Sequence, residues 1–182
     1  MPDFSRLEKH ISDNILEAQI KLGYEGRSMS LNYTSSSLCH LLGKKLSQEQ
    51  LRKILTDFAG HTAERLGMIS VSNIRNGFCI TVPPEGTAYI HNLNDGKGFI
   101  SSLIEAVRAH RSLDEILAVF RSFSADVSVT ETDNDEFQYL IRFENGIPDD
   151  YFYCMTVDEE IDGSPHVTYH RFIKEDYEDF NF

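Results

Sequence analysis

The stretch NIRNGFCITV, residues 73–82, decides the fold, because here the spacing of apolar residues changes from that of a helix to that of a strand. Phe78, Ile80 and Val82 alternate with other residues, as in a strand with one buried face. Asn76-Gly77 is a dipeptide that accepts the positive φ angles of a tight hairpin turn. The stretch therefore predicts an antiparallel hairpin.

The residues on either side of this hairpin extend the predicted sheet. Ile69 and Val71 form the partner strand. Pro83 and Pro84 interrupt the pattern because proline donates no backbone hydrogen bond, and TAYIH (87–91) is expected to resume it as a third strand. The prediction is a three-stranded unit at residues 68–91.

Helices are predicted before and after this unit, where apolar residues recur at intervals of three and four. Ser47 with Gln50, and Ser112 with Glu115, have the spacing of a capping box at a helix start. The expected helices cover residues 4–22, about 47–66, about 98–110 and 112–121, with one or two helical turns at 38–43 and a short strand at 29–33.

Beyond residue 125 the pattern is strand-like again. Four segments are separated by short, turn-rich connections, which favours an antiparallel meander. These segments are DVSVTE (126–131), EFQYLIRF (136–143), DYFYCMTV (150–157) and HVTYHRFI (166–173). The chain is thus predicted to be an α+β protein in which about four helices pack on antiparallel sheet, and residues 1–182 are expected to form a single domain.

Charge is distributed unevenly along the chain. Residues 1–124 carry 14 Lys+Arg and 13 Asp+Glu, whereas residues 125–182 carry 3 and 16, a balance of -13. The same C-terminal part holds 11 of the 20 Phe and Tyr residues. Negative potential repels nucleic acids and anionic lipid and attracts basic partners. We therefore expect no nucleic-acid binding and no membrane binding.

The composition indicates a cytoplasmic protein. The first ten residues are charged where a signal peptide is apolar, and no stretch approaches the ~18 apolar residues of a membrane span. Cys39, Cys79 and Cys154 lie far apart, without the close pairs of zinc or redox motifs.

Motifs for phosphate binding, metal binding and nucleophilic catalysis are missing or incomplete. Gly96-Lys97-Gly98 matches neither a P-loop nor a dinucleotide fingerprint and is expected to be a flexible connection. His166 and His170 have the spacing of zinc ligands on a helix, but on the expected strand they lie ~13 Å apart. The sequence therefore predicts no cofactor and no metal site, and it identifies no catalytic residue.

Two acidic clusters flank the predicted strand YFYCMTV and form the candidate partner-binding site. Tyr151 and Tyr153 are expected on one face of this strand and Phe152 on the other. Aromatic side chains framed by carboxylates would suit a basic protein partner; the alternative is that the aromatics are core and the acids keep the turns soluble. The candidate residues are Asp149, Asp150, Tyr151, Tyr153, Asp158, Glu159 and Glu160.

EAQIKLGY (17–24) and LNYTSSSLCHLLG (31–43), together with the length, resemble a family of functionally uncharacterised bacterial proteins. The resemblance extends over essentially the whole chain. It implies a bacterial, cytoplasmic protein and brings no activity or site residue with it.

The leading functional hypothesis is a non-enzymatic binding module whose acidic C-terminal sheet engages a basic protein. A second is a small enzyme in which folding brings His40, His61 or His91 beside carboxylates in a cleft. A third is a structural homo-oligomer built by pairing of edge strands.

Overall fold

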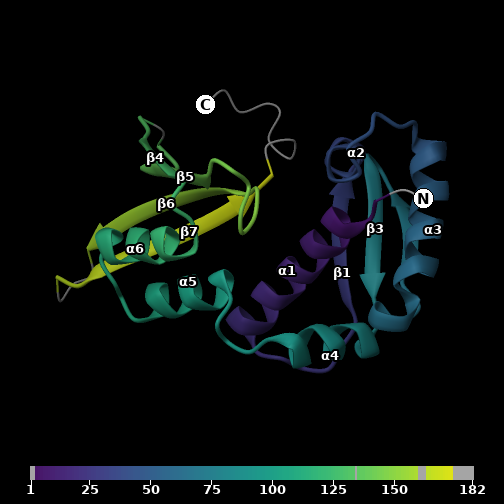
Figure 1. Ribbon diagram of the computed structural model, residues 1–182, viewed down its shortest axis with the longest axis horizontal. Helices are drawn as coiled ribbons and strands as arrows, with labels where there is room; N and C mark the ends of the chain where they lie inside the picture. Colours follow the sequence, from purple (N-terminus) through teal and green to yellow (C-terminus); the bar gives the residue numbers. More distant parts are fainter. Residues whose placement is uncertain (1–2, 134, 160–162, 174–182) are drawn as a thin grey trace. The chain divides into compact units, whose positions relative to one another are not determined.

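The computed structural model describes residues 3–133, 135–159 and 163–173. These residues form six helices and seven strands, drawn in Figure 1. In chain order they are α1 (Ser5–Leu22), β1 (Met29–Thr34), α2 (Ser35–Leu41), α3 (Gln48–Leu66), β2 (Ser70–Ile74), β3 (Gly77–Val82), α4 (Pro84–Leu93), α5 (Phe99–Arg108), α6 (Leu113–Phe123), β4 (Val127–Glu131), β5 (Tyr139–Phe143), β6 (Phe152–Glu159) and β7 (Pro165–Phe172).

The chain divides into two compact units, Met1–Asp95 and Gly96–Phe182. The division falls in the connection between α4 and α5, whereas the charge of the sequence changes near residue 124. Both units contain helices and an antiparallel sheet, which confirms the α+β class. That residues 1–182 behave as a single domain stays a prediction.

The sheet of the first unit has the order β1-β3-β2, with β3 in the centre. The predicted β2–β3 hairpin is confirmed, with Ile74 paired to Gly77. Its turn residues are Arg75 and Asn76, and neither has a positive φ. Gly77 is needed for another reason: a Cβ at this position would lie 1.9 Å from the backbone oxygen of Tyr33 on β1.

The third strand of this sheet is β1, and the prediction of a strand at 87–91 is wrong. TAYIH lies within α4, whose first residue is Pro84 and whose first turn contains Glu85. Proline is favoured at the first helical position because the missing N–H has no intrahelical partner there. PPEG therefore begins a helix instead of interrupting a sheet.

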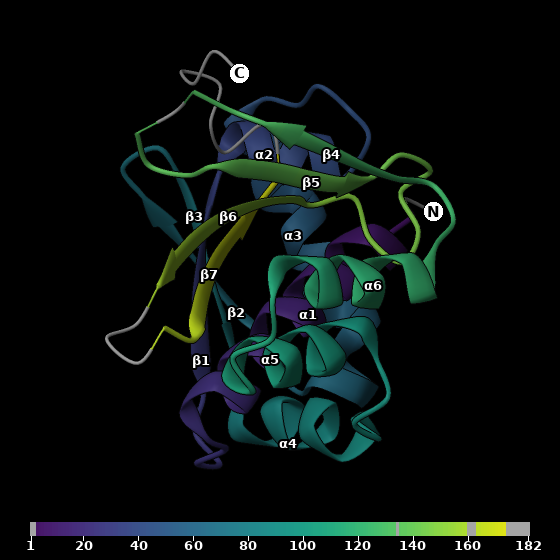
Figure 2. The ribbon, with the colours of Figure 1, turned by 90° about the vertical axis from the view of Figure 1, so that its left-hand side faces the viewer.

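One face of the first unit's sheet is covered. Phe78, Ile80 and Val82 are completely buried, whereas Cys79 and Thr81, which alternate with them, are half-buried. Helices α1 and α3 lie on the same side of this sheet (Figure 2).

Both predicted capping boxes are present. Ser47 and Gln50 form the one at the start of α3, and Ser112 and Glu115 form the one at the start of α6.

The second unit is a meander of order β4-β5-β6-β7, which confirms the predicted four-stranded C-terminal sheet. Helices α5 and α6 lie on one face of it (Figures 1 and 2). The ring of Phe99 on α5 packs edge-on against Phe120, Phe143 and Tyr153, with centroids 4.8, 4.9 and 5.6 Å away. Such aromatic contacts contribute stability beyond the burial of their area.

A smaller apolar cluster lies on the opposite face of this sheet. It contains Phe137, Cys154 and Phe172, with Leu140 and Phe152 packed against them. Tyr153 and Phe152 therefore belong to different faces of β6, as the alternation predicted.

Candidate functional site

The predicted partner-binding residues that the structure describes occupy two ends of the second unit's sheet. Asp149 and Asp150 lie in the connection before β6, and Asp158 and Glu159 are its last two residues. Glu160 lies outside the described residues, and of Glu159 only the backbone is described. Asp149-Asp150 and Asp158 are thus separated by nearly the length of β6.

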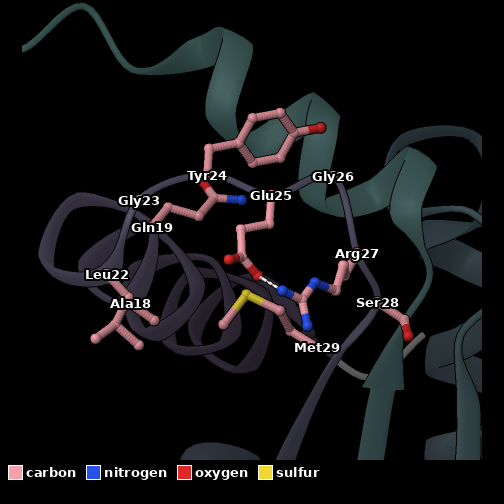
Figure 3. A pocket seen from close by; sticks show the side chains of 10 residues that line it. All are labelled: Ala18, Gln19, Leu22, Gly23, Tyr24, Glu25, Gly26, Arg27, Ser28 and Met29. Carbon is pink, nitrogen blue, oxygen red and sulfur yellow. Dashed lines mark ion pairs between the residues drawn. The ribbon is translucent and has the colours of Figure 1, made fainter.

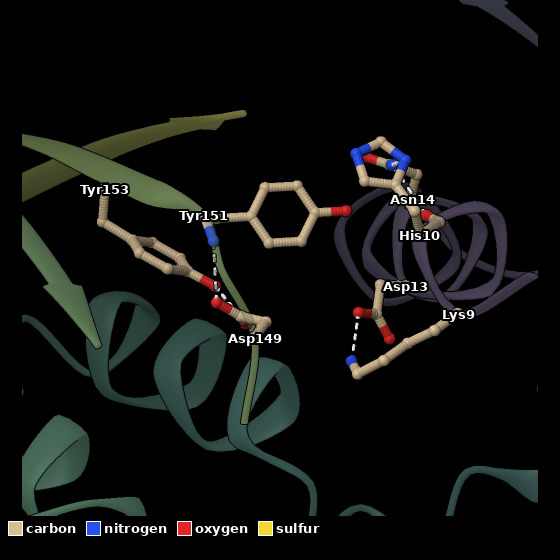
Figure 4. Close-up of polar contacts among 7 residues, drawn as sticks. All are labelled: Lys9, His10, Asp13, Asn14, Asp149, Tyr151 and Tyr153. Carbon is tan, nitrogen blue, oxygen red and sulfur yellow. Dashed lines mark hydrogen bonds and ion pairs between the residues drawn. The ribbon is translucent and has the colours of Figure 1, made fainter. Parts of the chain in front are cut away.

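At the start of β6, Asp149, Tyr151 and Tyr153 are buried, with 6%, 3% and 0% of their surface exposed. The Tyr153 hydroxyl donates a hydrogen bond to Asp149 Oδ2 at 2.7 Å (Figure 4). The Tyr151 backbone N–H donates to Asp149 Oδ1 at 3.3 Å. One carboxylate thus holds the backbone N–H of the residue just before β6 and a side chain on this strand. We call these residues, together with Arg171, the buried end of the sheet.

Arg171 on β7 completes the buried end. Its guanidinium carbon lies 4.1 Å from the centroid of the Tyr151 ring, in the geometry of a cation–π contact, and the residue is 9% exposed. Burial raises the pKa of the Tyr153 hydroxyl well above its ordinary value, and the charge of Asp149 raises it further, whereas the charge of Arg171 lowers it. Because these side chains are buried, they offer little area to a partner; Asp150 is half-buried.

The other end of the sheet is exposed and acidic. Strands β4 and β6 run in the same direction, so their last residues lie at the same end of the sheet. The Gln138 N–H donates to Met155 O at 2.9 Å, and the Thr156 hydroxyl donates to Glu136 O at 3.2 Å. These bonds fasten the turn after β4 alongside β6. The exposed acids there are Glu131, Asp133, Asp135, Glu136 and Asp158, which we call the acidic end.

The described arginines of β5 and β7 lie away from the acidic end. Within the described part of residues 125–173, the two arginines belong to the opposite end: Arg171 is buried, and Arg142, opposite Phe152 in the sheet, pairs with Glu144 at 2.7 Å. His166 lies opposite Asp158 in the sheet, with the ring of His110 at 6.1 Å. Arg111, next to His110, pairs with Glu115 at 3.0 Å.

The turn after β4 is the part of this site that sequence reasoning missed. The sequence pattern predicts TDND (132–135) only as one of the short, turn-rich connections between strands. A meander of four strands places its first and third turns at one end, so the predicted topology already contained the signal.

The histidines of the enzyme hypothesis have different neighbours. His40 Nε2 lies 2.6 Å from Arg6 Nη2, the ring of His61 lies 5.5 Å from Phe4, and the ring of His91 stacks on Tyr24 at 4.1 Å. Among the described residues, no group of three or more His, Cys, Asp or Glu is arranged to hold a metal ion.

The structure also places the histidine pair and the glycine-lysine-glycine segment that were considered as metal and phosphate sites. His166 and His170 lie on β7 and are exposed, as predicted for a strand. Gly96-Lys97-Gly98 lies in the connection between α4 and α5, so a helix precedes it instead of the expected strand. No helix in the described part of the chain has both the length and the apolar character needed to cross a bilayer.

The fold and these sites define an α+β protein with two antiparallel sheets and an acidic C-terminal half. A family model described as "Domain of unknown function, E. rectale Gene description (DUF3877)" matches residues 4–181, and the chain belongs to this family. The resemblance to an uncharacterised bacterial family is thereby confirmed. No curated protein and no solved structure matches the chain.

Proposed function

We propose that this protein is a non-enzymatic binding module whose acidic end engages a basic segment of a protein partner. The observation that carries the proposal is the gathering of exposed acids from the end of β4, the turn that follows it and the end of β6 at one end of the sheet. Asp158 is the residue of the sequence-predicted site that belongs to this surface and whose side chain is described. Glu131, Asp133, Asp135 and Glu136 extend it.

The buried end supports this surface without being part of it. Asp149 fixes the start of β6 through Tyr151 and Tyr153, and β6 carries Asp158 at its other end. A hydrogen bond also joins the turn that contains Glu136 to β6. The acids are therefore presented on a hydrogen-bonded sheet, which reduces the conformational entropy that a partner must immobilise.

Electrostatics favours a basic partner over a neutral one. Each exposed ion pair contributes only about 0–1 kcal/mol, but several carboxylates on one surface increase the rate of encounter and select against acidic partners. Three free cysteines among the described residues suit a reducing compartment, and we place the protein in the cytoplasm on that ground.

The test uses a fluorescent peptide of alternating lysine and alanine as a defined basic probe. We expect the purified protein to bind it, with affinity that falls steeply between about 0.05 and about 0.5 M salt as screening increases. Fluorescence anisotropy measures the affinity and its dependence on salt concentration. A glutamate–alanine peptide of equal length is the control ligand and is expected not to bind.

Matched variants locate the surface. Asp133→Asn, Asp135→Asn and Glu136→Gln together are expected to weaken probe binding about tenfold. Asp57→Asn, Glu64→Gln and Glu105→Gln change the charge equally at other exposed positions and are expected to leave affinity within about twofold. Equal losses in the two triple variants, or binding that salt does not change, would reject the acidic end as the docking surface.

A further inference from the structure

The first unit contains a cavity of about 330 Å³ at the C-terminal end of α1. It is lined by residues 18–19 and 22–29, the last turns of the helix and the connection to β1 (Figure 3). A volume of roughly 300–1,000 Å³ is usual for small-molecule sites, so the cavity suits a compact ligand. Its lining residues belong to the first unit, whereas the residues of the acidic end belong to the second.

Gln19 supplies a buried polar group to this cavity. The residue is 7% exposed, and its Nε2 donates to Thr87 O at 2.8 Å. Its Oε1 has no hydrogen-bond partner among the described residues. Thr87 also donates through its hydroxyl to Arg27 O at 2.8 Å, which fastens the connection to α4. Because this oxygen is itself buried, Gln19 forms a fixed part of the cavity wall, held by its bond to Thr87.

Glu25 and Arg27 supply one negative and one positive charge. Their side chains point toward each other as an ion pair, between Tyr24 and Met29 (Figure 3). The Arg27 and Glu25 side chains are 73% and 58% exposed, and exposed pairs of this kind contribute little stability. Breaking this ion pair so that each side chain can contact a ligand therefore costs little free energy. Arg27 alone among the lining residues carries positive charge, and the adjacent Glu25 would repel a phosphate.

Apolar and aromatic side chains also line the cavity. Ala18, Leu22 and Met29 contribute aliphatic surface, and Leu22 is 82% exposed. The Tyr24 ring stacks on His91 with an interplanar angle of 10°, which fixes its orientation at the cavity. An apolar ligand group placed here would cover Leu22 and gain from the removal of that surface from water.

We propose that this cavity binds a free α-amino acid with an apolar side chain. The ligand carboxylate pairs with Arg27, its ammonium group pairs with Glu25, and its side chain packs on Leu22 and Met29. An α-amino acid matches this arrangement because its two charged groups are attached to one carbon, next to its apolar group.

Isothermal titration calorimetry with L-leucine and L-methionine tests the proposal on the full chain. We expect binding of at least one of them, and at least about tenfold weaker binding of leucinamide and of N-acetyl-leucine, each of which lacks one charge. Absence of heat for both amino acids at millimolar concentration, or equal binding of the blocked derivatives, overturns it.

Variants assign the binding to this cavity. Arg27→Gln is expected to weaken binding about tenfold or more, and Arg75→Gln, at an exposed position of the same unit, is expected to leave it unchanged. Circular dichroism checks that both variants are folded. If Arg27→Gln binds as the parent does, the assignment is wrong. Because the lysine–alanine probe is assayed separately, either proposal can fail without the other.

Discussion

The two ends of the second unit's sheet use the same kinds of residue for different purposes. At the buried end, Asp149 accepts hydrogen bonds from Tyr153 and from the backbone of Tyr151. At the acidic end, Asp158 and the carboxylates of the β4–β5 turn are exposed. An acidic residue beside a tyrosine therefore does not by itself identify a binding surface. Its exposure and its hydrogen-bond partners decide between a structural and a functional role.

The largest effect is expected from removing the carboxylate of the buried end. Asp149→Ala leaves the Tyr153 hydroxyl buried without its acceptor, so we expect a loss of about 1–3 kcal/mol in the free energy of unfolding. Asp158→Ala, the matched change at the acidic end, is expected to stay within about 0.5 kcal/mol. Urea denaturation of both variants measures the difference. Equal losses would contradict the distinction between the two ends.

Removing only the hydroxyl at the buried end should have a smaller effect. Tyr153→Phe keeps the ring among Phe99 and Phe120, and Asp149 retains the N–H of Tyr151. We expect a loss of about 1–2 kcal/mol. Thermal unfolding followed by circular dichroism gives the value. A variant as stable as the parent would show that the Tyr153–Asp149 bond contributes nothing net.

Alkaline pH should weaken the second unit through Cys154. Burial, with a smaller contribution from Glu136, raises the pKa of this thiol from 9.0 to about 12. The unfolded chain loses the proton first, so the stability that Cys154 contributes is present below pH 9 and is lost as pH rises toward 12. Cys154→Ala should flatten this decline in urea titrations at several pH values. A decline of the same slope in the variant would assign it to other groups.

The rate at which each cysteine is alkylated also tests the raised pKa of Cys154, and this effect does not require unfolding of the protein. At pH 8 the raised pKa leaves Cys154 about a thousandfold less ionised than an ordinary thiol, because each pKa unit is a factor of ten. Cys39 and Cys79 are half-buried. We expect iodoacetamide to modify these two first, as peptide mass spectrometry would show. Early modification of Cys154 would mean that its side chain is accessible.

Local signals in the sequence predicted much of the fold. The capping boxes at Ser47 and Ser112 start their helices as expected, and the meander follows from strands joined by short turns. The error at 87–91 arose because a pair of prolines after a strand can either interrupt a sheet or begin a helix, and the residues around Pro83 and Pro84 fit either outcome. That β1 would pair with β3 depends on contacts between residues far apart in sequence, which a pattern does not encode.

The candidate site was harder to predict than the fold. Asp149-Asp150 reads as an exposed turn, and only the placement of Tyr153 four residues later makes Asp149 a buried acceptor. The exposed acids of the β4–β5 turn were recoverable from the meander. The cavity of the first unit had no sequence signal, because its charges lie in an irregular connection between α1 and β1.

Carboxyl labelling with a carbodiimide and glycinamide tests most directly the claim that one end is interior and the other is a docking surface. Mass spectrometry would follow each acid with and without the lysine–alanine peptide. We predict rapid labelling of Asp133, Asp135, Glu136 and Asp158, protection of these four by the peptide, and no labelling of Asp149 in either sample. Labelling of Asp149 at the rate of Asp158, or peptide protection of Asp57 and Glu64 equal to that of the acidic end, would contradict the account.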